Sequence, residues 1–159
     1  NEGNSGGPLI NLAGQMIGIN TAVSLQGQLI GFAIPVNTAR LALDSFQKNG
    51  RIVRPWLGVR YIPVSKEFAK LNELPRENGA FILPNQRGDS GVVKGSPAEK
   101  AGLKEKDIIF EIDGIAINDS KSLASVIAGK NVGDVLVLKI QRGKEIIEKK
   151  VTLEEIKKL

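Results

Sequence analysis

The sequence predicts a mainly β protein with a few helices, built as two parts in succession. Most of its apolar residues stand in short runs of Ile, Val and Leu, separated by Gly, Asn, Asp and Pro, which is typical of strands joined by turns. Hydrophobic residues make up 42% of the 159 residues but aromatic residues only 4%, so aliphatic side chains are expected to fill the core. A short basic stretch at residues 51–55 is the predicted linker between the two parts.

The first part, residues 1–50, is predicted to contain a few strands and one helix. The expected strands are residues 8–13, 15–22 and 29–34, and the expected helix begins near Val36 and ends at Asn49-Gly50. Asn37 or Thr38 is the expected helix cap, because either side chain can accept a hydrogen bond from the first turn. Three strands and one helix cannot bury both faces of a sheet. This part is therefore predicted to need partner strands that the chain does not supply.

The second part, residues 56–154, is predicted to be a complete domain. The expected strands are residues 56–64, 79–83, 91–93, 107–112, 135–141 and 145–153, and the expected helices are residues 65–74, 96–101 and 120–128. Ser96-Pro97-Ala98-Glu99 combines a Ser cap, Pro at the first helical position and Glu at the third, which indicates a helix start. Asp113-Gly114 indicates a hairpin turn. Residues 155–159 form a charged tail that is expected to fray.

Composition argues against several classes of function. The net charge of +5 is spread over interleaved basic and acidic residues, and no basic run with interleaved aromatics indicates nucleic-acid binding. The chain contains no Cys and no His, so we expect no disulfide, no metal site and no cofactor. Glu111 and Asp113 suggest a metal or acid pair, but a hairpin turn explains them better. No run approaches the roughly 20 apolar residues that a membrane span needs.

The stretch Gly3-Asn4-Ser5-Gly6-Gly7 resembles the nucleophile loop of trypsin-like serine proteases. Two later stretches, Gly18-Ile19-Asn20-Thr21-Ala22 and Gly31-Phe32-Ala33-Ile34-Pro35, narrow the resemblance to the HtrA/Deg branch. The resemblance implies that residues 1–50 belong to a trypsin-like β-barrel, with Ser5 as the nucleophile and the N–H groups of Gly3 and Ser5 as the oxyanion hole. The alternative is an ordinary glycine-rich turn.

The same resemblance implies a substrate-binding strand and a specificity pocket. Asn20, Thr21 and Ala22 would pair with the substrate backbone, and Val23 and Ile30 would flank the pocket. No acidic residue lies between Ala22 and Ile34, so an apolar residue before the cut is expected. The alternative is that Val23 and Ile30 are plain core residues. A Ser-His-Asp triad needs an imidazole, and this chain has no His, so the chain alone is expected to be inactive.

Residues 56–153 resemble a PDZ domain placed as in HtrA/Deg enzymes. Three motifs carry this resemblance: Trp56-Leu57-Gly58-Val59, the run from Gly95 to Leu103 (GSPAEKAGL), and the run from Asp107 to Gly114 (DIIFEIDG). The resemblance implies a groove that binds peptide C-termini, and its expected residues are Trp56, Leu57, Gly58 and Val59 for the carboxylate, Arg60, Tyr61 and Ile62 for the pairing edge, and Leu123, Val126 and Ile127 for the opposite wall. The alternative is that the helix residues form core only. Family patterns usually show Tyr where this chain has Trp56.

These resemblances imply an HtrA/Deg-like serine endopeptidase of protein quality control. Its partners would be unfolded or damaged proteins and peptide C-termini, and the whole protein would form homo-trimers or larger assemblies in an extracytoplasmic setting, the periplasm or cell envelope. The alternative is a non-catalytic PDZ peptide-binding module that carries an inert appendage.

Overall fold

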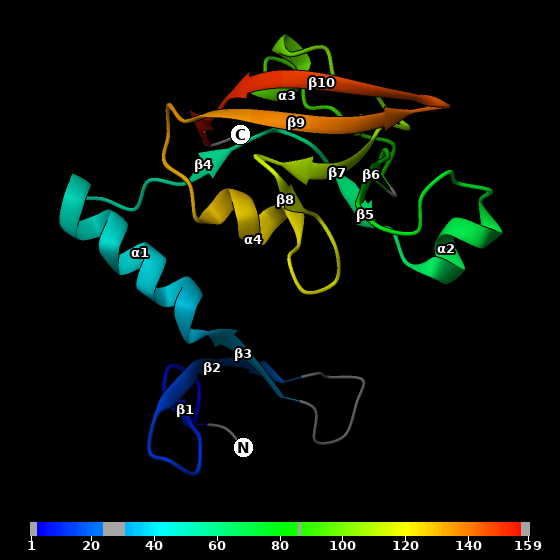
Figure 1. Ribbon diagram of the computed structural model, residues 1–159. Coiled ribbons are helices and arrows are strands. Elements are labelled where there is room, and N and C mark those ends of the chain that lie inside the picture. The colour runs from blue at the N-terminus through cyan, green and yellow to red at the C-terminus, as the bar shows by residue number, and fades with distance from the viewer. Residues whose placement is uncertain (1–2, 24–30, 86, 157–159) are drawn as a thin grey trace. The chain divides into compact units, whose positions relative to one another are not determined.

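The computed structural model describes residues 3–23, 31–85 and 87–156. The chain divides into two compact units, Asn1–Val53 and Arg54–Leu159, which are coloured blue to cyan and cyan to red in Figure 1. In the described part of the chain, no helix is long and apolar enough to cross a membrane.

The described residues of the first unit form one antiparallel sheet and one helix. Its elements are β1 (Pro8–Ile10), β2 (Met16–Val23), β3 (Gly31–Pro35) and α1 (Val36–Asn49), and the sheet order is β1-β2-β3. Strand β1 is shorter than the predicted strand at 8–13, because the Asn11 side-chain oxygen accepts hydrogen bonds from the N–H groups of Ala13 and Gln15 (3.0 and 2.9 Å). These bonds fold the chain into a turn that leads into β2.

Helix α1 begins differently from the sequence prediction. Pro35 is at the N-cap position and no side chain caps the helix, so the predicted cap at Asn37 or Thr38 is wrong. Both residues lie inside the first turn because the helix follows β3 directly. The predicted end is confirmed: Gly50 has a φ of 67°, and its N–H donates to the carbonyl oxygen of Phe46 (2.8 Å).

Little of the first unit is buried. Among the residues of this unit whose burial is described, Gly18 is the buried one. The large apolar side chains that stay exposed are Leu9, Ile10, Leu12, Met16, Ile17, Phe32, Ile34, Leu41, Leu43, Phe46 and Ile52. Sheet and helix both present apolar surface, as expected of a part that needs partner strands.

The second unit is built on one antiparallel sheet with three short helices (Figure 1). Its elements are β4 (Pro55–Trp56), β5 (Tyr61–Pro63), α2 (Lys66–Leu71), β6 (Ala80–Ile82), α3 (Pro97–Lys100), β7 (Ile108–Ile112), β8 (Ile115–Ala116), α4 (Leu123–Ala128), β9 (Val135–Arg142), β10 (Glu145–Thr152) and β11 (Glu154–Glu155). The sheet order is β10-β9-β7-β6-β5, with β8 paired to β7, and β11 pairs separately with β4. Strand β5 is therefore at one edge of the sheet.

Two local sequence signals are confirmed. The Ser96 hydroxyl accepts a hydrogen bond from the N–H of Glu99 (3.2 Å), and the Glu99 carboxylate accepts one from the N–H of Gly95 (2.7 Å), so α3 begins where predicted. Asp113 and Gly114 join β7 to β8 with φ values of 49° and 78°, the backbone of a tight hairpin turn.

The beginning of the charged tail is ordered, which corrects the expectation that residues 155–159 fray. Glu154 pairs with Trp56 and Glu155 with Pro55, and the N–H of Ile156 donates to the carbonyl oxygen of Arg54 (3.2 Å). Backbone pairing holds this segment despite its charge. Residues 157–159 lie outside the described residues.

The core of the second unit is aliphatic, as its composition predicts. The main core consists of Leu57, Ala80, Ile82, Ala98, Leu103, Ile109, Ile112, Ile117, Leu123, Ile127, Leu136, Leu138, Ile140, Val151 and Leu153. A smaller cluster of Val64, Ala69, Phe81 and Ile108 lies under α2. All of these residues belong to the second unit, so it has a core of its own.

An ion pair between the buried Asp107 and the partly exposed Arg142 supports the region around α3. The Arg142 guanidinium donates to both carboxylate oxygens of Asp107 (2.7 and 2.8 Å) and to the carbonyl oxygen of Gly102 (2.9 Å). Asp107 also accepts the N–H of Lys104 (2.8 Å). Hydrogen bonding to the Asp107 carboxylate raises the pKa of Arg142. The pair fixes the loop after α3 to strand β9.

Candidate functional site

The Ser5 loop is hydrogen-bonded to strand β2. The N–H of Gly6 donates to the carbonyl oxygen of Asn20 (2.8 Å), and the N–H of Asn20 donates to the carbonyl oxygen of Gly7 (2.9 Å). Gly3 and Gly6 have φ values of 95° and 84°, which residues with a side chain rarely adopt. The glycines thus allow a sharp turn that presents Ser5 beside β2.

Ser5 is exposed, and its hydroxyl lies 3.5 Å from the carbonyl oxygen of Thr21. The N–H of Ser5, one of the two predicted oxyanion donors, has no acceptor among the described residues. A nucleophilic Ser needs a base to take its proton, and a backbone carbonyl is not one. Among the described residues, the predicted nucleophile Ser5 and the predicted oxyanion donor, its own N–H, therefore lie in one exposed turn with no base beside them.

The predicted substrate strand is part of β2. Asn20 pairs with Ala33 and Ala22 with Phe32, and Thr21 lies at an irregularity between them, which directs its carbonyl oxygen toward Ser5. Val23 pairs with Gly31 at the end of β2. Ile30 lies outside the described residues, so the predicted specificity pocket does too.

The second candidate site begins at the edge strand β5. On the side of β5 that faces the sheet, the N–H of Arg60 donates to the carbonyl oxygen of Gly91 (2.7 Å), and the carbonyl oxygen of Arg60 accepts the N–H of Leu83 (3.2 Å). The N–H of Val64 donates to the carbonyl oxygen of Gly79 (2.9 Å). Ladder bonds in an antiparallel pair alternate from residue to residue. Arg60, Ile62 and Val64 therefore direct their backbone groups toward the sheet.

The residues between them direct their backbone groups away from the sheet. Val59 lies opposite Val92 in an isolated bridge. The hydrogen bonds of this bridge are made by Gly58 and Arg60, the chain neighbours of Val59. The N–H and C=O of Val59 itself therefore point away from the sheet. Tyr61 is also an outward position by the same alternation. Pro63 follows as the next outward position and has no N–H. The open edge thus extends over Val59 and Tyr61, and a further strand can pair there.

The turn before β5 is fixed by hydrogen bonds from residues 93–98. The N–H of Ala98 donates to the carbonyl oxygen of Leu57 (2.9 Å), and the carbonyl oxygen of Gly58 accepts the N–H of Val93 (3.0 Å) and the Ser96 hydroxyl (3.3 Å). The N–H groups of Leu57, Gly58 and Val59 have no acceptor among the described residues. Successive free N–H groups form a binding site for an anion such as a carboxylate.

Gly58 is required by this geometry. Its φ is 85°, and a Cβ atom there would lie 2.1 Å from the Cβ of Ser96 and 3.1 Å from the Trp56 ring. Trp56 packs against the turn at this point. Sequence reasoning identified Ser96 only as a helix cap; its second role, in holding Gly58, depends on contacts between residues 38 positions apart.

Helix α4 presents fewer residues to this edge than its sequence predicts. Leu123 and Ile127 are only 1% and 8% exposed and belong to the main core, which is the alternative that the sequence left open for them. Val126 is partly buried against that core and keeps some exposure. The Tyr61 hydroxyl accepts the N–H of Ala124 (3.2 Å), so β5 and the start of α4 face each other.

Two other predicted groove residues point elsewhere. Arg60 donates from its guanidinium to the carbonyl oxygen of Ser90 (2.6 Å), and Ile62 is exposed. Side chains alternate along a strand, so both lie on the face opposite Val59 and Tyr61. Their backbones define the edge strand, but their side chains do not line the groove side.

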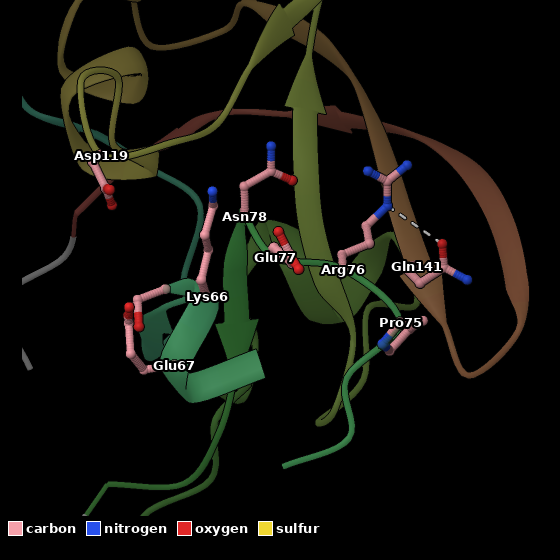
Figure 2. Close-up of a pocket in the computed structure, with 9 residues that line it drawn as sticks. Lys66, Glu67, Pro75, Arg76, Glu77, Asn78, Asp119 and Gln141 are labelled. Carbon is pink, nitrogen blue, oxygen red and sulfur yellow. Dashed lines mark hydrogen bonds between the residues drawn. The ribbon is translucent and has the colours of Figure 1, made fainter. Parts of the chain in front are cut away.

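A separate hollow of about 700 Å³ lies beside α2 and shares no residue with this edge (Figure 2). Its lining residues are Ser65, Lys66, Glu67, Pro75, Arg76, Glu77, Asn78, Asp119 and Gln141. The Arg76 guanidinium stacks 3.5 Å above the centroid of the Phe110 ring and donates to the Gln141 side chain (3.4 Å). The other charges are of both signs, so the hollow indicates no ligand class. No group of three or more potential metal ligands occurs in the described residues.

Comparisons with known proteins agree with both parts of the chain. A PDZ domain model matches residues 55–153, and a trypsin model matches residues 1–43. The chain is 42% identical to a probable periplasmic serine endoprotease DegP-like of Chlamydia muridarum over 98% of the chain and 31% of that protein. It is 39% identical to a protein of the same description from Rhizobium meliloti over 89% of the chain and 27% of that protein.

Two solved structures have a similar fold. HtrA-type protease AlgW with tripeptide aligns with a TM-score of 0.74 and 31% identity, over the whole chain and 52% of that protein. HtrA-type protease AlgW with decapeptide aligns with a TM-score of 0.73 and 30% identity, over the whole chain and 48% of that protein. The chain thus spans about a third of the curated relatives and about half of these solved chains.

Proposed function

Because the chain belongs to the PDZ domain family and joins that domain to a trypsin-like segment, as HtrA/Deg proteases do, we propose that it acts within a serine endopeptidase of protein quality control. In this proposal the chain supplies the nucleophile and the domain that binds peptide C-termini. The substrates are unfolded or damaged proteins in the periplasm or cell envelope. The relatives named as periplasmic serine endoproteases support the setting and the reaction.

The proposed chemistry starts at Ser5. Its hydroxyl attacks the scissile carbonyl carbon, and the N–H groups of Gly3 and Ser5 stabilise the oxyanion that forms. A His from outside these 159 residues takes the Ser5 proton, because the chain itself has no His. Asn20, Thr21 and Ala22 pair with the substrate backbone, while Val23 and Ile30 favour a Val, Ile, Leu or Ala before the cut.

The catalytic proposal predicts that the isolated chain is inactive. The purified chain should not cleave casein, and a fluorophosphonate should label it no faster than a Ser5→Ala control, because no base activates Ser5. Mass spectrometry of the labelled protein measures this directly. Rapid stoichiometric labelling at Ser5 would show that a base is already present and would overturn the account of the inactive chain.

The peptide-binding proposal depends on one observation, the three free N–H groups at Leu57, Gly58 and Val59 next to the open edge of β5. A C-terminal carboxylate accepts hydrogen bonds from them, and the peptide backbone pairs with the outward groups of Val59 and Tyr61. The last side chain enters the space beside Leu57 and Val126. Pro63 ends the ladder because it has no N–H to offer.

Micromolar affinity is the expected range. Burying one Val, Leu or Phe side chain contributes about 1.5–3 kcal/mol, and each pairing hydrogen bond contributes roughly 1 kcal/mol. Association costs several kcal/mol in lost translational and rotational freedom. A short peptide therefore binds reversibly, as suits an enzyme that samples many substrates.

The test of this proposal compares one peptide as free acid and as C-terminal amide. A peptide ending in Val should bind, and amidation should weaken it at least about tenfold, because charge-assisted hydrogen bonds to the carboxylate are lost. Calorimetric titration measures both affinities. Equal affinities for the free acid and the amide would show that the 57–59 turn does not bind the C-terminal carboxylate.

The second candidate function is a peptide-binding module without catalysis, and the absence of His favours it for the chain by itself. The two candidates differ in what supplies the base. Labelling of Ser5 in the parent protein, together with a His and an Asp in trypsin-like order ahead of Asn1, supports the enzyme. A parent without them supports the module. Assembly into trimers or larger forms remains part of the enzyme proposal and is measurable by sedimentation.

A further inference from the structure

The chain contains two Asn-Gly pairs, Asn49-Gly50 and Asn78-Gly79. In such a pair the backbone nitrogen of the Gly can attack the side-chain amide carbon of the Asn, and a Gly hinders this attack least because it has no Cβ. The two pairs are chemically alike. A difference in their reactivity therefore has to come from the structure around them.

The pair Asn49-Gly50 is held by hydrogen bonds at the end of α1. The Asn49 side-chain amide donates to the carbonyl oxygen of Ser45 (2.9 Å), and the N–H of Gly50 donates to the carbonyl oxygen of Phe46 (2.8 Å). The attacking and the attacked group are thus each engaged with a different acceptor. Both bonds have to open before the Gly50 nitrogen can reach the amide carbon of Asn49.

The pair Asn78-Gly79 lies between α2 and β6, and neither of its reacting groups is held in this way. Asn78 is exposed, and its side-chain amide has no hydrogen-bond partner among the described residues (Figure 2). The N–H of Gly79 likewise has no acceptor in the described part of the chain. Gly79 is buried and closely packed, since a Cβ there would lie 2.7 Å from the Ile108 side chain. Its nitrogen therefore stays in place, and the exposed Asn78 side chain can rotate toward it.

We propose that Asn78 is a site of spontaneous deamidation in the folded protein, with water as the co-reactant. The Gly79 nitrogen gives up its proton to solvent and bonds to Cγ of Asn78. The Cγ–Nδ2 bond then breaks, and the amide nitrogen takes up a proton and leaves as ammonia. Water opens the resulting cyclic imide at either of its two carbonyl carbons, which gives Asp or iso-Asp. One water is consumed for each ammonia released, and nothing is oxidised or reduced.

The modification changes the hollow beside α2 and the start of β6. Both products add a negative charge to the hollow, whose lining already includes Glu67, Glu77 and Asp119. Iso-Asp also adds a methylene group to the main chain immediately before Gly79, whose carbonyl oxygen accepts the N–H of Val64 (2.9 Å). The lengthened chain therefore meets the sheet at the point where β6 pairs with the end of β5.

The experiment stores the whole chain at mildly alkaline pH, once folded and once unfolded in guanidinium chloride, and follows both pairs by peptide mapping with mass spectrometry. The unfolded chain gives the reference ratio of the two rates, because its hydrogen bonds are open. Relative to that reference, Asn78 in the folded chain should react at least about tenfold faster than Asn49, since two hydrogen bonds protect Asn49-Gly50. Asn78→Gln is the control and should remove the product at this position while the rate at Asn49 stays the same.

The route through the cyclic imide has a readout of its own. Both Asp and iso-Asp should form at position 78, and Asn78→Asp supplies the reference peptide that separates them. Asp alone would show direct hydrolysis by water and would overturn the attack by Gly79. Equal relative rates at Asn49 and Asn78 in the folded chain, or reaction at Asn78 only after unfolding, would overturn the selection of Asn78 by the structure.

Discussion

Gly58 lies in the turn before β5 with a φ of 85°, and its missing side chain leaves room for Ser96 and Trp56. The Ser96 hydroxyl and the N–H of Val93 both bond to the carbonyl oxygen of Gly58 from the side of the core. With that oxygen turned inward, the neighbouring N–H groups are free to face a ligand. A single residue thus links the close packing of α3 to the proposed carboxylate site.

Replacing Gly58 should affect both stability and peptide binding. Gly58→Ala places a side chain at an unfavourable φ, which costs about 1–2 kcal/mol, and adds overpacking against Ser96 of about 1–3 kcal/mol. Gly133→Ala is the matched control, because Gly133 has a φ of 92° and no atom within 4 Å of its Cβ position. Chemical denaturation and peptide titration measure both effects. Equal destabilisation by the two variants would contradict the packing argument.

The hairpin formed by β7 and β8 depends on its turn residue Asp113. The Asp113 carboxylate accepts hydrogen bonds from the Lys130 ammonium (2.7 Å) and from the N–H of Val137 (2.8 Å). The bond from Lys130 is the main cause that lowers the pKa of Asp113, and the bond from Val137 adds to it. The turn thereby connects β7 to β9 and to the end of α4.

The lowered pKa predicts how this hairpin responds to acid. A carboxylate with a lowered folded-state pKa contributes stability above its ordinary pKa and loses it as pH falls through the folded value. Below about pH 4, the wild-type free energy of unfolding should therefore fall more steeply than that of Asp113→Asn. Lys130→Met should reduce the steepness similarly, since it removes the main partner. Parallel pH profiles for all three proteins, measured by urea unfolding, would show that the Lys130 bond contributes nothing.

The two units of the molecule differ in how well they bury their apolar residues. The main core lies entirely within residues 57–153, whereas Gly18 is the buried residue among those of the first unit with described burial. Exposed Leu, Ile and Phe side chains on both the sheet and α1 leave the described residues of the first unit without a comparable core. Stability is therefore expected to be concentrated in the second unit.

This difference predicts where the chain is protected. Hydrogen exchange should be slow in β7 and β9 and much faster in β1 to β3, because opening of the first unit exposes little additional apolar surface. Residues 54–159 expressed alone should unfold at the same temperature as the second unit in the whole chain. Slow exchange throughout β2 in a confirmed monomer would contradict the prediction, and self-association through the exposed faces is checked by sedimentation.

Local signals explain why much of the fold was predictable from the sequence. The α3 start at Ser96, the hairpin at Asp113-Gly114 and the end of α1 at Gly50 depend on residues within a few positions of each other, and each was predicted correctly. The α1 cap failed because the chain passes directly from β3 into the helix at Pro35. Neither the pairing of Glu154 with Trp56 nor the bond of Tyr61 to Ala124 has a local signal.

The prediction for helix α4 shows the same limit of local sequence signals. Helical spacing places Leu123, Val126 and Ile127 on one face, but it does not tell which of them points into the core. The packing of α4 buries Leu123 and Ile127 and leaves Val126 only partly buried. A Leu123→Glu substitution would therefore unfold the domain rather than test binding, and Val126 is the better position for that purpose.

The central claim, that the 57–59 turn and the edge of β5 bind a peptide C-terminus, is tested most directly by locating the peptide on the protein. Nitrogen-labelled protein is titrated with a free-acid peptide ending in Val and with its amide, and backbone amide shifts are followed. The account predicts the largest shifts at Leu57, Gly58, Val59 and Tyr61, saturating at micromolar free acid and much weaker with the amide. Shifts that avoid residues 57–61, or equal shifts with acid and amide, would contradict it.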